Sequence, residues 1–360
     1  MLFLGNKMLA PILLLIFCTF STQAQILSKI FKIDTTSRGY YEVLDSITNN
    51  RLFVSEKLTS PSFQSKGDRS WVKYLSNGNT NLGIGQTYEW FNLNIGVNFT
   101  ALNNDDDIKG RTRFLDLHTQ IIGRPYIVNI FGQFYKGVFL VPDSGKNAPG
   151  IPYEQRPDIR TRLVGGTVYF VPNWRRFSFA AAITQRDWQK KSAGSPLYGL
   201  EFFWGNIQGD SALIPKTYQG SFKRSGFDNV RFVEVAAGLG YGYTLVIKKH
   251  WFVHGSGTSG FSLGYHGERT SGVSDQKNFY LKPNLLVRAA VGYNSYKFNG
   301  ALYLFGNQNI SGNDQMKTRI ITHNVRAIFA YRIAPGPKLK SRYNKILSLN
   351  PSWKNLPPKE

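Results

Sequence analysis

The chain has almost no cysteine, the residue that forms disulfides in small folds and supplies thiol chemistry. It has 360 residues and one cysteine, Cys18, which lies inside an N-terminal apolar stretch. The rest of the chain can therefore form no disulfide and no thiolate metal site. Beyond that stretch, no apolar run approaches the ~20 residues that a transmembrane helix needs. The sequence thus favours neither a disulfide scaffold nor a helical membrane protein.

Acidic residues are also scarce. The chain has 44 Lys and Arg against 22 Asp and Glu, for a net charge of +22. Such a basic chain would ordinarily suggest nucleic acid as a partner. An exported chain does not meet nucleic acid, so we expect none. Attraction to the phosphates of lipid headgroups and lipopolysaccharide, or an anion-attracting lumen, fits the charge better.

The N-terminus has the features of a secretory leader. Lys7 precedes the apolar core Met8–Phe17, and small residues occupy the −3 and −1 positions in Thr22–Ala24. This arrangement predicts a signal peptide over 1–24, cleaved after Ala24.

What the chain has in abundance is alternation of apolar and polar residues. The cleanest example is Phe91–Phe99, in which every odd position is large and apolar and every even position is Asn or Gly. In a strand, these two sets lie on opposite faces. Similar alternation covers 81–90, 115–121, 126–134, 198–204, 233–247, 281–293, 296–304 and 325–333. Many such strands in an exported chain predict an all-β, antiparallel transmembrane β-barrel of the outer membrane.

Composition supports this class. Charged residues make up 18% of the chain and aromatic residues 14%, and there are 35 glycines. Soluble domains carry more charge, about 25%, whereas membrane barrels need aromatic girdles at both interfaces. The alternative all-β architecture is a soluble sandwich, which the aromatic residues near the strand ends disfavour.

The predicted organisation has four parts: a signal peptide (1–24), a periplasmic N-terminal segment (25–49), the barrel (50–334) and a basic periplasmic tail (335–360). Thirteen candidate strands are found. Because single-chain barrels have even numbers, we predict twelve strands, with fourteen as the alternative. Tight periplasmic turns are predicted near 90–91, 124–125, 173–174, 248–249 and 294–295, and longer outer connections near 101–110, 141–158, 188–196, 208–228, 267–278 and 308–316.

Charged residues on the predicted inner face form one group of candidate functional residues. Its acids are Glu89, Asp116, Glu201 and Glu234, and its bases are Lys282, Arg288, Lys297, Arg326 and Arg332. They could form a charged constriction that selects solutes. They could equally form a salt-bridged plug in a narrow lumen.

Asp116 and His118 are the weak catalytic candidates. They share the inner face with Cβ atoms ~7 Å apart, and an acid–His pair could orient a base for hydrolysis. No serine elbow or second paired carboxylate accompanies them, so a structural hydrogen-bond network is the favoured interpretation. The sequence therefore favours a barrel that is not an enzyme, and it predicts no cofactor and no metal site.

Two further groups are binding candidates. Arg156, Asp158, Arg160 and Arg162 could hold a phosphate or carboxylate, or Arg and Asp could clamp their own loop. Trp188, Lys190 and Lys191 are predicted near a long loop, as an anchor at the membrane interface beside headgroup phosphates.

Four segments resemble a known family. The blocks Arg156–Arg162 and Trp188–Ser195, and the stretches Asn81–Phe99 and Tyr241–Lys249, are similar to a domain-of-unknown-function family from Gram-negative bacteria. The resemblance covers roughly 50–334 and implies an outer-membrane barrel without an assigned activity.

Three functions stay open from the sequence. The first is a pore or binding barrel for small solutes or lipids; the alternatives are an outer-membrane hydrolase acting on lipid or peptide, and a structural or adhesion scaffold. The expected partners are outer-membrane lipid, lipopolysaccharide and the machinery that assembles such barrels, while the small-molecule cargo is not specified.

Overall fold

The computed structural model describes residues 39–44, 46–67, 70–88, 91–98, 105–142, 151–270, 276–338 and 340–341. The predicted signal peptide, Glu89 and most of the basic tail lie outside these residues. The chain divides into two units, one comprising Met1–Thr36 with Ala334–Glu360 and the other Ser37–Ile333. Every element named below lies in the second unit.

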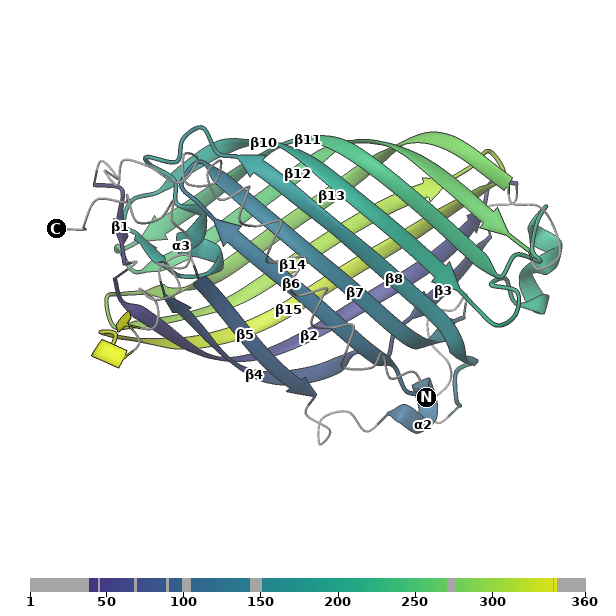
Figure 1. Cartoon of the computed structure of the whole chain (residues 1–360), viewed down its shortest axis with the longest axis horizontal. Helices are drawn as coiled ribbons and strands as arrows, with labels where there is room; N and C mark the ends of the chain where they lie inside the picture. The colour runs from purple at the N-terminus through teal and green to yellow at the C-terminus, as the bar shows by residue number, and fades with distance from the viewer. Residues whose placement is uncertain are drawn as a thin grey trace. The chain divides into compact units, whose positions relative to one another are not determined.

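Ten antiparallel strands pair in a closed ring, in which β15 bonds to both β14 and β2 (Figure 1). In ring order they are β2 (Thr48–Ser65), β3 (Trp71–Leu75), β7 (Tyr126–Val141), β8 (Gln155–Phe170), β10 (Ala193–Gln208), β11 (Asn229–Ile247), β12 (Trp251–Arg269), β13 (Gln276–Asn294), β14 (Phe298–Gly312) and β15 (Met316–Ile333). The predicted all-β antiparallel barrel is confirmed.

Three more strands extend the wall between β2 and β7. They are β4 (Asn79–Tyr88), which pairs with β2; β5 (Phe91–Asn98), which pairs with β4; and β6 (Arg113–Ile122), which pairs with β7. Both β3 and β4 pair with β2, so they follow each other along a single crossing of the wall. If β5 and β6 also paired, the ring would be β2, β3–β4, β5, β6, β7, β8 and β10 to β15, which is twelve crossings.

The outer surface of the wall is apolar and the inner surface is mixed. Along β11, Val233, Val235 and Leu239 are exposed, whereas Glu234 and Ala236 between them are buried. This is the period-two pattern of a strand whose outer face contacts lipid. Among the described residues, no helix is long and apolar enough to cross a membrane.

The connections distinguish the two ends of the barrel. At one end, called the turn end, β2 begins and β15 ends, and tight turns join β11 to β12 and β13 to β14. Lys248 and Lys249 in the first of these turns have φ of 50° and 64°, left-handed values that occur in tight turns. The opposite end, called the loop end, carries the short helix α2 (Asp106–Lys109) and the long connection from β10 to β11.

The predicted tight turn at 173–174 is wrong. Residues 171–192, called the plug, form a long connection at the turn end that contains helix α3 (Phe179–Ile183) and strand β9 (Asp187–Gln189). β9 pairs with β1 (Tyr41–Val43), and Ser178 caps α3 by accepting a 3.1 Å bond from the Ala181 amide. The predicted outer connection over 188–196 is also wrong, since β10 starts at Ala193 at the turn end.

The plug enters the barrel because its side chains are apolar. Phe177, Phe179, Ala180 and Ile183 are buried. They pack against inner-face residues from around the ring, namely Ile122, Ile127, Tyr169, Leu197, Phe252, Ala290, Ala301 and Tyr303. The plug therefore fills the lumen at the turn end.

A second connection fills the loop end. Residues 209–228, called the cap, contain the 3-10 helix η2 (Lys216–Ser221). Leu213, Ile214, Phe222 and Phe227 of the cap are buried against the inner face, in one cluster with residues such as Phe203. The lumen is thus covered at both ends.

Glycines on the inner face leave room for aromatic rings to approach the backbone of the wall closely. A Cβ atom on Gly205 would lie 2.2 Å from two ring carbons of Phe232, on the neighbouring strand. Since Phe232 is buried in the loop-end cluster, its ring has no free space to move into.

We expect Gly205→Ala to lower the free energy of unfolding by about 1–3 kcal/mol, because the added methyl group overpacks the Phe232 ring. The matched control is Gly255→Ala, where nothing lies within 4 Å of the added Cβ atom; its effect should stay within about 0.5 kcal/mol. Urea unfolding in lipid vesicles measures both. Equal stability of the two variants would contradict the close packing.

Candidate functional site

The wall has one place where neighbouring strands do not pair. No ladder joins β5 to β6 among the described residues, although each is bonded to a strand on its other side. We call their facing edges the seam. Asn94 and Gly96 of β5 and His118 of β6 are exposed, although they lie on the inner face. The lumen is therefore accessible at the seam.

On the β5 side, the inner surface is polar and basic. Arg51 of β2 is buried, and its guanidinium donates to the Asn92 side chain and, over 3.1 Å, to Asn94 Oδ1. It also reaches the plug, where Nη1 donates to the Thr184 carbonyl over 3.3 Å. One arginine therefore connects the seam to the plug.

On the β6 side, Asp116 is fully engaged by other residues. Its carboxylate pairs with Lys57 Nζ at 2.9 Å and accepts from Tyr135 Oη at 3.1 Å and Gln133 Nε2 at 3.3 Å. No hydrogen bond joins it to His118, although both residues are described and both lie on the inner face. Asp116 therefore belongs to a network with Lys57, Tyr135 and Gln133 and is not hydrogen-bonded to His118 in this structure.

His118 instead faces a small central cavity. The cavity holds about 30 Å³ of free volume, room for one or two water molecules, and is lined by Lys57, Asp116, His118, Phe131, Gln133, Phe305, Asn307, Thr322 and Asn324. The His118 and Phe305 ring centroids are 6.4 Å apart. These residues contribute no serine or cysteine nucleophile.

Two predicted lumen arginines lie near this cavity against aromatic rings. The Arg326 guanidinium is 4.6 Å from the Phe53 ring centroid. Arg288 lies 5.7 Å from the ring of Phe305 and 5.5 Å from that of Phe179 in the plug. None of Arg51, Arg288 and Arg326 has a described carboxylate within ion-pair distance. The lumen beside the seam therefore carries an excess of positive charge.

The predicted acids Glu201 and Glu234 are buried and bound by neutral groups. Glu201 accepts from Tyr169 and, at 2.5 Å, from Asn284 Nδ2. Glu234 accepts from Tyr280 Oη and Asn309 Nδ2, each at 2.7 Å. Neither Glu201 nor Glu234 forms an ion pair with a predicted lumen base, so the ion pairs inside the barrel involve other acids, such as Asp116 with Lys57.

Two lysines predicted for the lumen differ from each other. Lys282 pairs in register with the buried Ser262 and is half-buried on the inner face near the loop end. Lys297 is exposed in the turn between β13 and β14, so its assignment to the lumen is wrong. The alternation of apolar residues continues across this turn, so the sequence pattern alone did not show where the turn lies.

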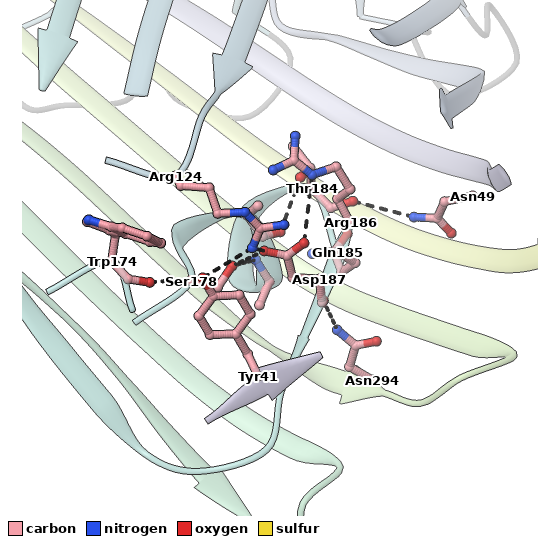
Figure 2. A network of polar contacts seen from close by, with 12 residues as sticks. Tyr41, Asn49, Arg124, Trp174, Ser178, Thr184, Gln185, Arg186, Asp187 and Asn294 are labelled. Carbon is pink, nitrogen blue, oxygen red and sulfur yellow. Dashed lines mark hydrogen bonds and ion pairs between the residues drawn. The ribbon is translucent and has the colours of Figure 1, made fainter. Parts of the chain in front are cut away.

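Polar contacts tie the plug to the wall (Figure 2). Asp187 accepts from Ser178 Oγ at 2.5 Å and lies 3.6 Å from Arg124 Nη1. Its backbone carbonyl accepts from Asn294 Nδ2 at 3.0 Å. Arg332 of β15, a predicted lumen residue, donates to the Gln185 carbonyl.

Tyr41 of β1 extends this network. Its hydroxyl donates to the Trp174 carbonyl over 2.9 Å and accepts from Arg124 Nη1 over 3.1 Å. Burial raises the pKa of this hydroxyl above its ordinary value near 10. Tyr41 therefore keeps its proton, and the donor to Trp174, at physiological pH.

Trp188, Lys190 and Lys191 belong to the plug, so their assignment to an outer loop is wrong. The Trp188 indole donates to the Lys249 carbonyl over 2.7 Å, in the turn between β11 and β12. Lys190 pairs with Glu42 and lies 4.5 Å from the Trp188 ring centroid. Lys191 Nζ lies 5.4 Å from the ring centroid of Tyr40. All three hold the plug together with the N-terminal strand.

The four residues at the start of β8 divide into two pairs. Arg156 binds Asp158 through two 2.8 Å bonds, and Arg156 Nη1 donates to the Ala212 carbonyl of the cap over 3.0 Å. This is the loop clamp that the sequence left open as an alternative. Arg160 and Arg162 lie on the outward face of β8, half-buried.

A metal site is not formed by the described part of the chain, where no three His, Cys, Asp or Glu side chains cluster suitably. Several residues that shape the site carry no signal in the sequence. Lys57 and Arg51 precede Asp116 by many residues on another strand, and Arg124 and Asp187 meet only because the plug folds back into the barrel.

A closed antiparallel wall with an apolar outer face and a filled polar lumen defines a transmembrane β-barrel of the outer-membrane type. The chain belongs to the family described as domain of unknown function DUF4421, which matches residues 32–333.

Solved structures similar to this chain include several barrels. The outer membrane protease OmpT from Escherichia coli has 6% identity and a TM-score of 0.39, covering 81% of this chain and 98% of its own. The toluene transporter TbuX from Ralstonia pickettii has 10% identity and a TM-score of 0.28, covering 80% and 90%. Ail from Yersinia pestis has 9% identity and a TM-score of 0.21, covering 77% and 97%. No curated protein matches the sequence.

We expect the refolded protein to be silent in planar bilayers, because the plug and the cap cover the lumen. Asp187→Ala/Arg332→Ala removes two anchors of the plug, each a charge-assisted contact of about 1.5–3 kcal/mol, and should produce discrete conductance steps.

The control is Lys297→Ala, which alters an exposed side chain in the same turn region and should stay silent. Stable conductance of the unmodified protein would contradict the closed lumen. A silent double variant whose plug has become sensitive to protease would show that the plug does not block the pathway.

Proposed function

We propose that this protein is an outer-membrane barrel that binds a small amphipathic molecule with an anionic head group, admitted sideways through the seam. The main support is that the inner-face residues Asn94, Gly96 and His118 are exposed at the seam, whereas the plug and the cap cover the two ends of the lumen. The turn end would face the periplasm, as in barrels whose short turns and termini lie there.

Backbone chemistry supports a seam that opens and closes. Unpaired N–H and C=O groups are costly in hydrocarbon. The facing edges of β5 and β6 can satisfy these groups by pairing with each other, or by holding a polar ligand between them. A bound molecule that keeps the strands apart therefore competes with closure of the wall.

The surfaces on each side of the seam support an amphipathic ligand. Outside, Ile95 and Val97 of β5 and Leu115 and Leu117 of β6 are each more than half exposed and apolar. Inside, the lining is polar. An apolar tail can therefore stay in the hydrocarbon while a polar head enters the lumen.

The charge of the lumen supports an anionic head group. Arg51 and Arg326 have no described carboxylate partner, and Lys57 is already neutralised by Asp116. Burying such cations without counter-charge is costly. A carboxylate or phosphate entering beside them would offset that cost and form charge-assisted hydrogen bonds.

The route can be tested with thiol labelling in a Cys18→Ser background. We expect His118→Cys to react faster with an acyl-chain maleimide dissolved in the bilayer than with a water-soluble maleimide of the same reactivity. Mass spectrometry measures the modified fraction over time.

Two controls separate the route from general reactivity. Leu117→Cys, on the outer face of the same strand, should react with the acyl reagent in either case. Ser262→Cys, an inner-face position only 1% exposed and distant from β6, should react with neither. Faster modification of His118→Cys from water would refute lateral access.

The head-group charge has a separate test. Arg326→Met keeps an apolar side chain over Phe53 but removes the charge, and should weaken binding of dodecanoate about tenfold, the loss of one charge-assisted contact. Binding of dodecanol should change little in the same calorimetric titration. Lys297→Met is the exposed-charge control. If Arg326→Met weakened dodecanol and dodecanoate equally, the head-group assignment would be wrong.

A further inference from the structure

A row of cations lies on the outer surface of the barrel at the loop end. Arg113 pairs in register with Lys136, and Lys136 pairs with Arg160, so the three occupy neighbouring positions on β6, β7 and β8. Arg113 and Lys136 are exposed, and Arg160 is half-buried. Arg162 lies one outward position further along β8 toward the turn end.

Placing like charges directly opposite one another across strands is destabilising, since such side chains start only ~5 Å apart. The described acids do not relieve this arrangement. Asp158, on the same face of β8, accepts hydrogen bonds from Nε and Nη2 of Arg156, each at 2.8 Å. None of Arg113, Lys136, Arg160 and Arg162 forms an ion pair with a described residue. The row therefore carries unneutralised charge.

The same residues form a recess with an apolar floor. Arg113, Lys136, Arg160 and Arg162 line a shallow, open depression of about 280 Å³ together with Phe134. In the next register row toward the turn end, Leu115 pairs with Phe134, and both are exposed on the outer face. Cations thus sit directly at the boundary of the apolar band that contacts lipid.

We infer that Arg113, Lys136, Arg160 and Arg162 bind the phosphate group of a membrane lipid at the loop end. Arginine offers paired N–H donors that match phosphate oxygens, and lysine adds a point charge. Acyl chains attached to that phosphate would lie over Leu115 and Phe134. This apolar surface below the cations selects a lipid over a free phosphate ion, and the site lies outside the lumen, independent of the seam.

The test compares lipid retention in nanodiscs of phosphatidylcholine doped with lipid A, a glycolipid with two phosphates. Lys136→Ala/Arg160→Ala should reduce the lipid A retained, measured by native mass spectrometry, about tenfold or more. The control Lys249→Ala/Lys297→Ala removes two exposed cations from the turn end and should retain lipid A as the unmodified protein does.

Equal retention by the double variant, or an equal loss in the control, would overturn the inference. If the double variant does not fold, Arg160→Gln provides the same comparison with one contact removed. Inorganic pyrophosphate should not displace the lipid; complete displacement would identify a free-anion site and refute the lipid. The amount of lipid A retained does not depend on the result of the His118→Cys labelling experiment. A negative result at the outer-surface site can therefore be distinguished from a negative result at the seam.

Discussion

The need to pair every backbone donor and acceptor in hydrocarbon governs this structure. Water cannot satisfy strand edges inside a bilayer, so a sheet that crosses it must close on itself. Closure is achieved where β15 pairs with β2 along almost the whole length of both strands. At the loop end β3 bridges β2 and β7, and this short strand completes the ring of paired strands. At the seam, the facing edges of β5 and β6 do not pair with each other in the described part of the chain, so their backbone groups there are not satisfied by the wall.

Burial of apolar side chains explains why the lumen is filled rather than empty. Inner-face glycines admit aromatic rings, and two apolar connections fold inward from opposite ends. Buried carboxylates such as Glu201 are then satisfied by Tyr and Asn side chains, as buried polar groups must be. With both ends covered, the inner surface beside β5 and β6 remains the accessible part of the interior. A ligand would therefore reach the lumen from the side of the barrel, between β5 and β6.

Alternation in the sequence predicted the barrel and the direction of most side chains. Period-two patterns place Glu201, Glu234, Arg288 and Arg332 on the inner face, where the structure has them buried. The pattern failed at Lys297, because alternation does not show where a strand stops and a turn begins. It also failed at the plug, where a tight turn at 173–174 was predicted and the structure has a long connection with helix α3, capped by Ser178.

By itself, the sequence determined the class of protein, because alternation, few charges and many aromatic residues are local properties that every strand displays. It also supplied most of the charged candidates. Only the tertiary structure decided how they combine. Asp116 bonds to Lys57 and Tyr135 rather than to His118, and Arg113, Lys136 and Arg160 align across three strands. Register between strands and the inward folding of connections are set by long-range packing, which no local pattern encodes.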